Sequence, residues 1–144
     1  MARRFLVALF VLTALGLPLA AQGFKSGDAG LEASLNSINI QASVDLGSFT
    51  AQLSADFGTK QAQLQTWMKT EKLQPAEIYL LLELGRIANK PPATVLGVYK
   101  KNKGKGWGAV AQAMGIKPGS SEFKALKSAA AARNKKLKAA KKKK

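Results

Sequence analysis

The chain contains neither cysteine nor histidine among its 144 residues. Without cysteine it cannot form a disulfide or use a thiol nucleophile, and without histidine it has no imidazole base. Zinc, copper and haem sites generally need sulfur or imidazole ligands, so sites of these kinds are excluded as well. We therefore expect a protein that is not an enzyme and that holds no metal and no cofactor.

Acidic residues are scarce too, with 8 Asp and Glu against 23 Lys and Arg and a formal net charge of +15. Such an excess of positive charge favours binding to polyanions. Hydrophobic residues make up 47% of the chain, which is enough for the core of one modest domain. This composition argues against a wholly disordered chain.

The N-terminal segment is typical of a secretory signal peptide. Arg3 and Arg4 precede an apolar run over 5–17, and small residues follow up to Ala21. We expect cleavage after Ala21, so that the mature protein begins at Gln22 and is periplasmic or secreted. The alternative is an uncleaved membrane anchor, for which this apolar run is at the lower limit of length.

The remaining charge is unevenly distributed along the chain. Residues 22–74 contain 4 Lys against 5 acidic residues, a net charge of −1, whereas residues 75–144 contain 17 Lys and Arg against 3 acidic residues, a net charge of +14. The last stretch, 128–144, has 8 basic residues, no acidic one, and mainly alanine otherwise. We expect this low-complexity tail to be disordered or helical, and any affinity for polyanions to reside in the C-terminal half.

The segment 22–45 is expected to be extended. Within it Ile38, Ile40, Ala42 and Val44 alternate with polar residues, a period of two that is compatible with one strand. No second convincing strand is found to pair with it, so a strand in a dimer, an extended segment and a helix all stay open.

From residue 46 to residue 127 the apolar spacing predicts a mainly α domain, a small bundle of about five or six short helices. Leu46, Phe49, Leu53 and Phe57 share one helical face, and Gly58 would end that helix. The other predicted helices are one capped by Thr59, one over 76–89 opened by Pro75, one after Pro91-Pro92, one over 107–114, and one from Ser120 or Ser121 to about 128. The leucine-rich helix 76–89 is expected to be the buried centre.

The stretch 100–108 places four lysines around glycines immediately before a predicted helix. The unpaired N–H groups and the dipole of a helix start favour an anion, so one interpretation is a phosphate or carboxylate site. The other is a solvated loop in which Trp107 anchors the chain in the core and the glycines form a tight turn. We favour the solvated loop because clustered lysines are usually only solvated.

Two sequence motifs fail in context. Gly104-x-Gly106-x-x-Ala109 matches a dinucleotide-binding fingerprint, but no acidic residue follows at the distance that ribose recognition requires. Ser121-x-x-Lys124 matches a motif of penicillin-recognising enzymes, but the chain is too short for their fold. A serine that caps a helix is the better interpretation of the second motif.

Residues 107–127 allow an alternative function, because they resemble a helix-turn-helix pair that could bind DNA. The polar Ser121 stands where that motif has a branched apolar residue, and a signal peptide would remove the protein from the chromosome. A nucleic-acid-binding module is therefore the second hypothesis.

The first hypothesis is an exported protein that binds an anionic envelope component through the basic loop and the basic tail. Anionic lipid, lipopolysaccharide and other envelope polyanions are the expected partners, since each lysine near an anionic membrane contributes about 1 kcal/mol. The candidate anion-binding residues are Lys100, Lys101, Lys103, Lys105, Lys135, Lys136, Lys138, Lys141, Lys142, Lys143 and Lys144.

Three strings in the C-terminal half carry a resemblance. They are Trp107-Gly108-Ala109-Val110-Ala111, Gly115-Ile116-Lys117-Pro118-Gly119-Ser120 and Phe123-x-x-Leu126-Lys127. Over 75–127 the chain resembles a family of small exported bacterial proteins of uncharacterised function. A histidine often stands at the position of Lys124 in that family, so no role for such a histidine applies here. The resemblance implies a periplasmic or secreted helical protein and no activity.

Overall fold

The computed structural model describes residues 23–143, which form seven helices and confirm the expected mainly α fold. The predicted signal peptide and Lys144 lie outside the described residues. The helices are α1 (Ala29–Val44), α2 (Leu46–Phe57), α3 (Gln61–Thr70), α4 (Pro75–Ala88), α5 (Pro92–Lys101), α6 (Trp107–Ala113) and α7 (Ser121–Lys142).

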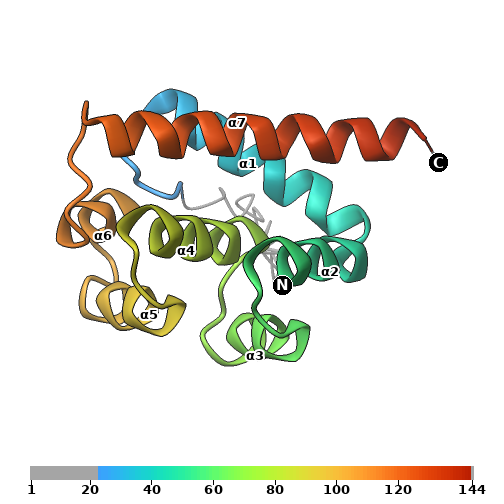
Figure 1. Ribbon diagram of the computed structural model, residues 1–144, viewed down its shortest axis with the longest axis horizontal. Helices are drawn as coiled ribbons and strands as arrows, with labels where there is room; N and C mark the ends of the chain where they lie inside the picture. The colour runs from blue at the N-terminus through green and yellow to red at the C-terminus, as the bar shows by residue number, and fades with distance from the viewer. Residues whose placement is uncertain (1–22, 144) are drawn as a thin grey trace, which may run out of the picture.

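The helices are arranged in three tiers, as Figure 1 shows. The long helices α1 and α7 pack against each other along one side, and both contact α4. Helices α6, α4 and α2 form the middle tier, and the short helices α5 and α3 cover its other side. Helix α4 is therefore the centre of the domain, as its sequence predicts.

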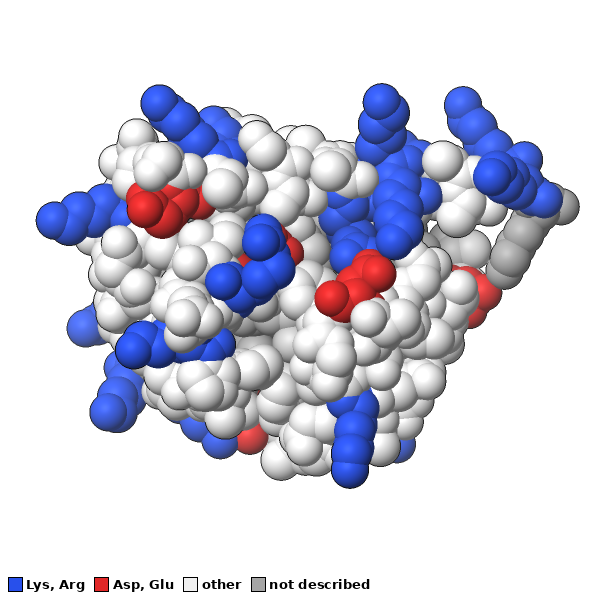
Figure 2. All heavy atoms as spheres, viewed as in Figure 1, with Lys and Arg blue, Asp and Glu red and all other residues white. Residues whose placement is uncertain are grey.

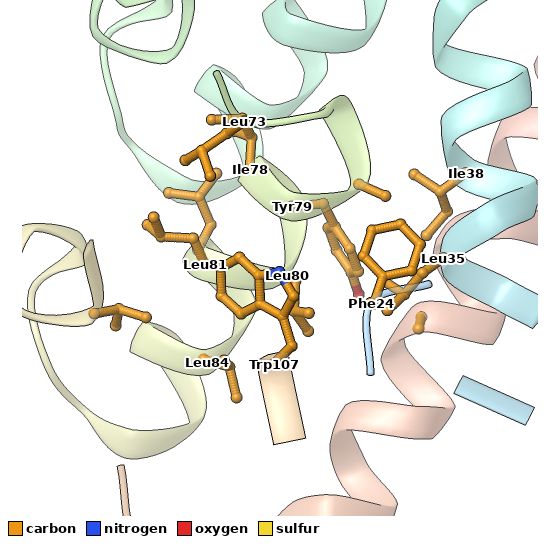
Figure 3. Close-up of a cluster of buried hydrophobic side chains, with 14 of the residues drawn as sticks. Phe24, Leu35, Ile38, Leu73, Ile78, Tyr79, Leu80, Leu81, Leu84 and Trp107 are labelled. Carbon is orange, nitrogen blue, oxygen red and sulfur yellow. The ribbon is translucent and has the colours of Figure 1, made fainter. Parts of the chain in front are cut away.

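The sequence of α4 explains its central place. Its residues from Ile78 to Gly85 are all buried, including Glu83. Pro75 begins the helix, and Gln74 and Glu77 form a capping box that satisfies its first N–H groups. In Figure 3 the residues of α4 point to two sides, with Leu81 near Trp107 and Tyr79 near Phe24. An apolar surface on most sides lets this one helix contact both outer tiers.

The segment predicted as extended is the helix α1. Asp28 caps it, because its Oδ1 accepts a hydrogen bond of 2.8 Å from the N–H of Leu31. The buried residues Leu31, Leu35, Ile38 and Ala42 follow one another at four, three and four residues, which is the spacing of a helix face. The alternating pattern wrongly suggested a strand because it combined the buried Ile38 and Ala42 with the exposed Ile40 and Val44.

The basic tail is not a separate segment either. Helix α7 runs without interruption from Ser121 to Lys142, well beyond the predicted end near residue 128. Ala130 and Leu137, both in the predicted tail, are buried in the core. Ser120 caps the helix by accepting a hydrogen bond from the N–H of Phe123, as the sequence predicts. The alanine-rich composition thus builds a long helix whose inner face packs on the domain.

One smaller prediction about a helix start also fails. Thr59 does not cap α3, which begins at Gln61 with Lys60 in the capping position and no side-chain cap. The side chain of Gln61 instead donates a hydrogen bond of 2.9 Å to Oγ1 of Thr50, which ties α3 to α2. This contact fixes the position of α3 against α2 but leaves the first N–H groups of α3 without a side-chain cap.

The glycines around Trp107 have a structural purpose, since residues 24–26 pack directly against them. A Cβ on Gly106 would overlap the Cβ of Lys25, and a Cβ on Gly108 would lie 2.9 Å from the carbonyl oxygen of Ser26. Gly106 also has a φ of 90°, which side chains rarely adopt. Gly106 and Gly108 therefore form a slot for residues 24–26.

Replacing Gly106 with alanine is expected to lower the free energy of unfolding by about 2 kcal/mol or more, through the strained φ and the collision with Lys25. Gly97→Ala is the matched control, because a Cβ there meets nothing within 4 Å. The control should be neutral or stabilising by up to about 1 kcal/mol, since alanine favours helix. Urea denaturation of both variants measures the difference, and equal stabilities would contradict the slot.

Candidate anion-binding surfaces

Backbone carbonyl groups already occupy the start of α6, which favours the solvated-loop interpretation over a phosphate site. The N–H of Trp107 donates to the carbonyl oxygen of Phe24 at 2.8 Å, and the N–H of Gly108 donates to that of Lys25 at 3.0 Å. The residues in the slot therefore already occupy the groups that would bind a phosphate. Trp107 itself is buried and stacks on Tyr99 with 4.8 Å between ring centroids, as the solvated-loop interpretation expects.

The lysines of the loop do not converge on one point. Lys100 forms an ion pair of 2.7 Å with Glu71. Lys101, Lys103 and Lys105 are exposed and form no ion pair with any residue of the described part. These lysines add positive charge to the surface, but none of them lines the hollow of about 240 Å³ that Asn102, Gly104 and Gly106 of the same loop help to form.

The lysines of α7 are better organised. Lys135, Lys138 and Lys142 follow one another at three and four residues, so they lie on one helix face, and all three are exposed. At 1.5 Å per residue they span about 10 Å along the helix axis. Within residues 23–143 none of them forms an ion pair. We call these three residues the lysine row.

The other predicted lysines of the tail flank this row. Lys141 and Lys143 are exposed and lie in the last turns, where positive charge also interacts favourably with the helix dipole. Lys136 differs, because its Nζ lies 3.3 Å from a carboxylate oxygen of Asp56. Figure 2 shows Lys and Arg side chains projecting along the edge occupied by α7 and at its C-terminal end.

The loop and the lysine row do not form one surface. Figure 1 shows α5 and α6 at one end of the molecule and the C-terminal end of α7 at the other. A single small ligand therefore cannot contact both. Binding through both the loop and the tail therefore applies only to an extended partner such as a membrane or a polymer.

An ion-pair cluster that the sequence analysis did not identify joins α7 to α2. Nη2 of Arg133 lies 2.7 Å from Oδ2 of Asp56, and the Arg133 side chain is only 9% exposed. Burial raises the pKa of Asp56, but its contacts with Arg133 and Lys136 outweigh burial and leave the pKa below its usual value. The guanidinium also lies over the rings of Phe57 and Tyr79. Arg133 is thus a structural residue.

A second buried charge lies on α4. The side chain of Glu83 is 5% exposed and is paired with Arg86, whose Nε donates to it at 3.0 Å. That contact raises the pKa of Arg86. Nearby, burial raises the pKa of Tyr79, whose hydroxyl has no hydrogen-bond partner within the described residues. In the sequence, the signal for this buried ion pair is the single acidic residue Glu83 within the leucine-rich stretch of α4.

A hollow of about 330 Å³ lies beside these two clusters, between α2, α4 and α7. Its charged lining consists of Asp56, Glu83, Arg86, Arg133 and Lys136. Four of these five residues are already in the ion pairs Asp56–Arg133 and Glu83–Arg86, and Lys136 also contacts Asp56. The three basic and two acidic side chains leave a net charge of only +1 (3 − 2), and all five are engaged in ion pairs, so no free cation among these lining residues is available to select an anion.

An apolar surface lies near the C-terminal end of α7. Ile40 is 63% exposed, Val44 61% and Leu46 41%, and these are the large hydrophobic residues of the described chain that stand out to solvent. They lie at the end of α1 and the start of α2, and we call them the apolar corner. A groove of about 80 Å³ lined by Val44, Leu137 and Lys141, among others, joins this corner to α7.

The connection between α6 and α7 does not have the form of a helix-turn-helix. It spans residues 114–120, longer than the turn of about three or four residues that the motif uses. At the start of α7, where that motif reads DNA, Phe123 is buried and Glu122 is acidic. The pair is therefore a poor candidate for major-groove recognition.

Three further findings concern the whole described region. No helix within residues 23–143 combines the length and the hydropathy that crossing a membrane requires. The same residues contain no group of three acidic side chains placed to hold a metal ion. In the comparisons with known proteins, no family model matches the chain, and neither a curated protein nor a solved structure shows significant similarity to it.

Proposed function

We propose that this protein is exported, is not an enzyme, and binds an anionic component of the cell envelope through the lysine row of α7. The observation that carries the proposal is the row itself. Lys135, Lys138 and Lys142 share one exposed helix face without an acidic partner in the described chain, while the opposite face of α7 packs into the core.

The rigidity of α7 supports the row as the principal contact. Because Leu137 is buried and Arg133 is fixed by Asp56, the lysine backbones are held in place before a ligand arrives. Preorganised groups lose less conformational entropy on binding than groups on a flexible tail. The exposed lysines of the loop, such as Lys103, serve as a second contact only on an extended anionic surface.

The test compares K135Q/K138Q/K142Q with the matched control K60Q/K90Q/K117Q, which also removes three exposed lysines, from other segments. The protein is purified as the cell makes it, and intact mass establishes whether residues 1–21 are still present. Because all variants share the same N-terminus, differences between them report the substituted lysines. Binding is measured by sedimentation with phosphatidylcholine vesicles that contain about one-third phosphatidylglycerol, a fraction chosen to give a strongly anionic surface.

We expect the row variant to bind about 100-fold more weakly at low salt, since each lysine contributes about 1 kcal/mol near such a surface. Its affinity should also depend less steeply on salt concentration, while the control stays close to the unmodified protein. If the row variant bound as well as the control, the proposal would be wrong. Tighter binding to duplex DNA than to vesicles at the same salt concentration would favour the nucleic-acid alternative instead.

A further inference from the structure

We infer that the partner is a lipid bilayer, and that the apolar corner inserts into it while the lysines at the end of α7 contact the lipid phosphates. This inference rests on the proposed function and names its partner. The corner consists of Ile40, Val44 and Leu46, and the adjoining lysines are Lys141 and the lysine row.

The exposure of the corner has no explanation in the fold. The inner face of α1 is complete without it, because Leu31, Leu35, Ile38 and Ala42 are buried. Ile40 and Val44 are one helical turn apart on the outer face and are each more than 60% exposed. Polar residues at these positions would serve the fold equally well. Clustered exposed aliphatic side chains are typical of a contact surface.

The neighbouring charge selects a membrane over other partners. The groove that joins the corner to α7 is lined by Val44 and Asp45 on one side and by Lys141 on the other, and with the three lysines of the row the local charge is 4 − 1 = +3. Aliphatic side chains beside lysines match the boundary between acyl chains and anionic headgroups. Phosphates of a nucleic acid would attract the lysines but would leave Ile40 and Leu46 in water. The combination therefore favours a lipid surface.

The same residues predict how the protein is oriented on the bilayer. The corner and the C-terminal end of α7 lie at one end of the molecule, opposite α5 and α6 (Figure 1). A shallow contact at this end would hold the protein on the bilayer surface. The basic loop, with Lys101 and Lys103, would then point away from the membrane.

The first experiment uses the fact that the chain has no cysteine, so that a single introduced cysteine is labelled uniquely. V44C carries an environment-sensitive fluorophore at the corner, and A93C carries it on an exposed position of α5. With phosphatidylcholine vesicles containing about one-third phosphatidylglycerol, we expect a blue shift at residue 44 and none at residue 93. Vesicles of phosphatidylcholine alone should leave both spectra unchanged.

The second experiment measures the affinity of I40S/V44S/L46S. We expect it to bind the anionic vesicles at least about 10-fold more weakly, while its affinity for heparin, a soluble polyanion, stays within about 2-fold. A matched unfolding curve in urea shows whether the substituted residues leave the fold intact. If this variant is unstable, the fluorescence of the V44C protein decides the question, because that protein changes only one exposed side chain.

The outcomes separate this inference from the proposed function. If K135Q/K138Q/K142Q loses vesicle binding but I40S/V44S/L46S binds normally and residue 44 shows no blue shift, the corner does not insert and the inference is overturned. In that case the lysine row still binds an anion, and the proposed function stands. If the row variant binds normally, the proposed function fails first, and the inference fails with it.

Discussion

Ending the chain after Lys127 is expected to lower the free energy of unfolding by more than about 4 kcal/mol, a large part of the roughly 5–15 kcal/mol of a typical domain. The deletion removes Ala130 and Leu137 from the core and takes away most of the helix that packs along α1. Truncating one buried leucine to alanine alone costs about 2–5 kcal/mol.

The deletion also breaks an ion pair. Arg133 would no longer contact Asp56, so a carboxylate beside the core would lose the guanidinium that holds its pKa low. Removing one partner of a partly buried pair leaves the other without compensation, which adds to the loss. We therefore expect a chain ending at Lys127 to be largely unfolded at room temperature.

Circular dichroism and urea denaturation measure this effect. The matched control ends after Ala140, which removes only the terminal lysines and retains Leu137, and its stability should change by less than about 0.5 kcal/mol. Equal stabilities for the two shortened proteins would show that the outer half of α7 does not support the fold. A vesicle comparison that used the shorter chain would confuse unfolding with lost binding, which is why the lysine row is tested by substitution.

Arg86→Ala is expected to destabilise the protein by about 2–3 kcal/mol, although the side chain of Arg86 is 58% exposed. The reason is its partner, because the carboxylate of Glu83 is 5% exposed and would be left buried without a cation. Solvent screening at Arg86 places the effect below that of a fully buried pair. Surface arginines without such a partner usually change stability by less than about 0.5 kcal/mol.

A double-mutant cycle with Glu83→Gln tests the cause. If the loss comes from an unpaired buried charge, the variant E83Q/R86A should be more stable than R86A, by at least about 1 kcal/mol. If the two substitutions add without coupling, the cost of R86A comes from lost packing and the explanation is wrong. Lys90→Gln is the control, because it also removes one exposed positive charge close to Arg86 in sequence.

Much of the fold follows from local patterns. Pro75, the leucine run after it and the αL residue Asn89 define α4 almost to the residue, and Gly58 ends α2 as expected. These signals work because a helix start, a helix stop and an apolar face each depend on neighbouring residues. The exposure of the candidate anion-binding lysines could also be predicted from sequence, because lysine side chains are rarely buried.

Where a local pattern misled or stayed ambiguous, the reason is the same. Segments distant in sequence pack against the residues concerned, and this packing decides their conformation and exposure. The alternation from Ile38 to Val44 suggested a strand, but packing of α1 against α4 and α7 buries Ile38 in the core and leaves Ile40 exposed. The glycines next to Trp107 allowed either an anion site or a tight turn, and the packing of residues 24–26 against them favours the turn. In both places the contact joins segments many residues apart, and such contacts cannot be deduced from spacing alone.

The sequence by itself determined the composition-based limits, the helical class, the central place of residues 76–89 and the concentration of charge in the C-terminal half. Only the tertiary structure decided which charges remain available. Packing engaged Arg133, Lys136 and Lys100 in ion pairs and left the lysine row without one in the described chain. The physical reason is that a net charge adds up along a chain, whereas neutralisation depends on distances of a few ångströms between helices, which the fold alone fixes.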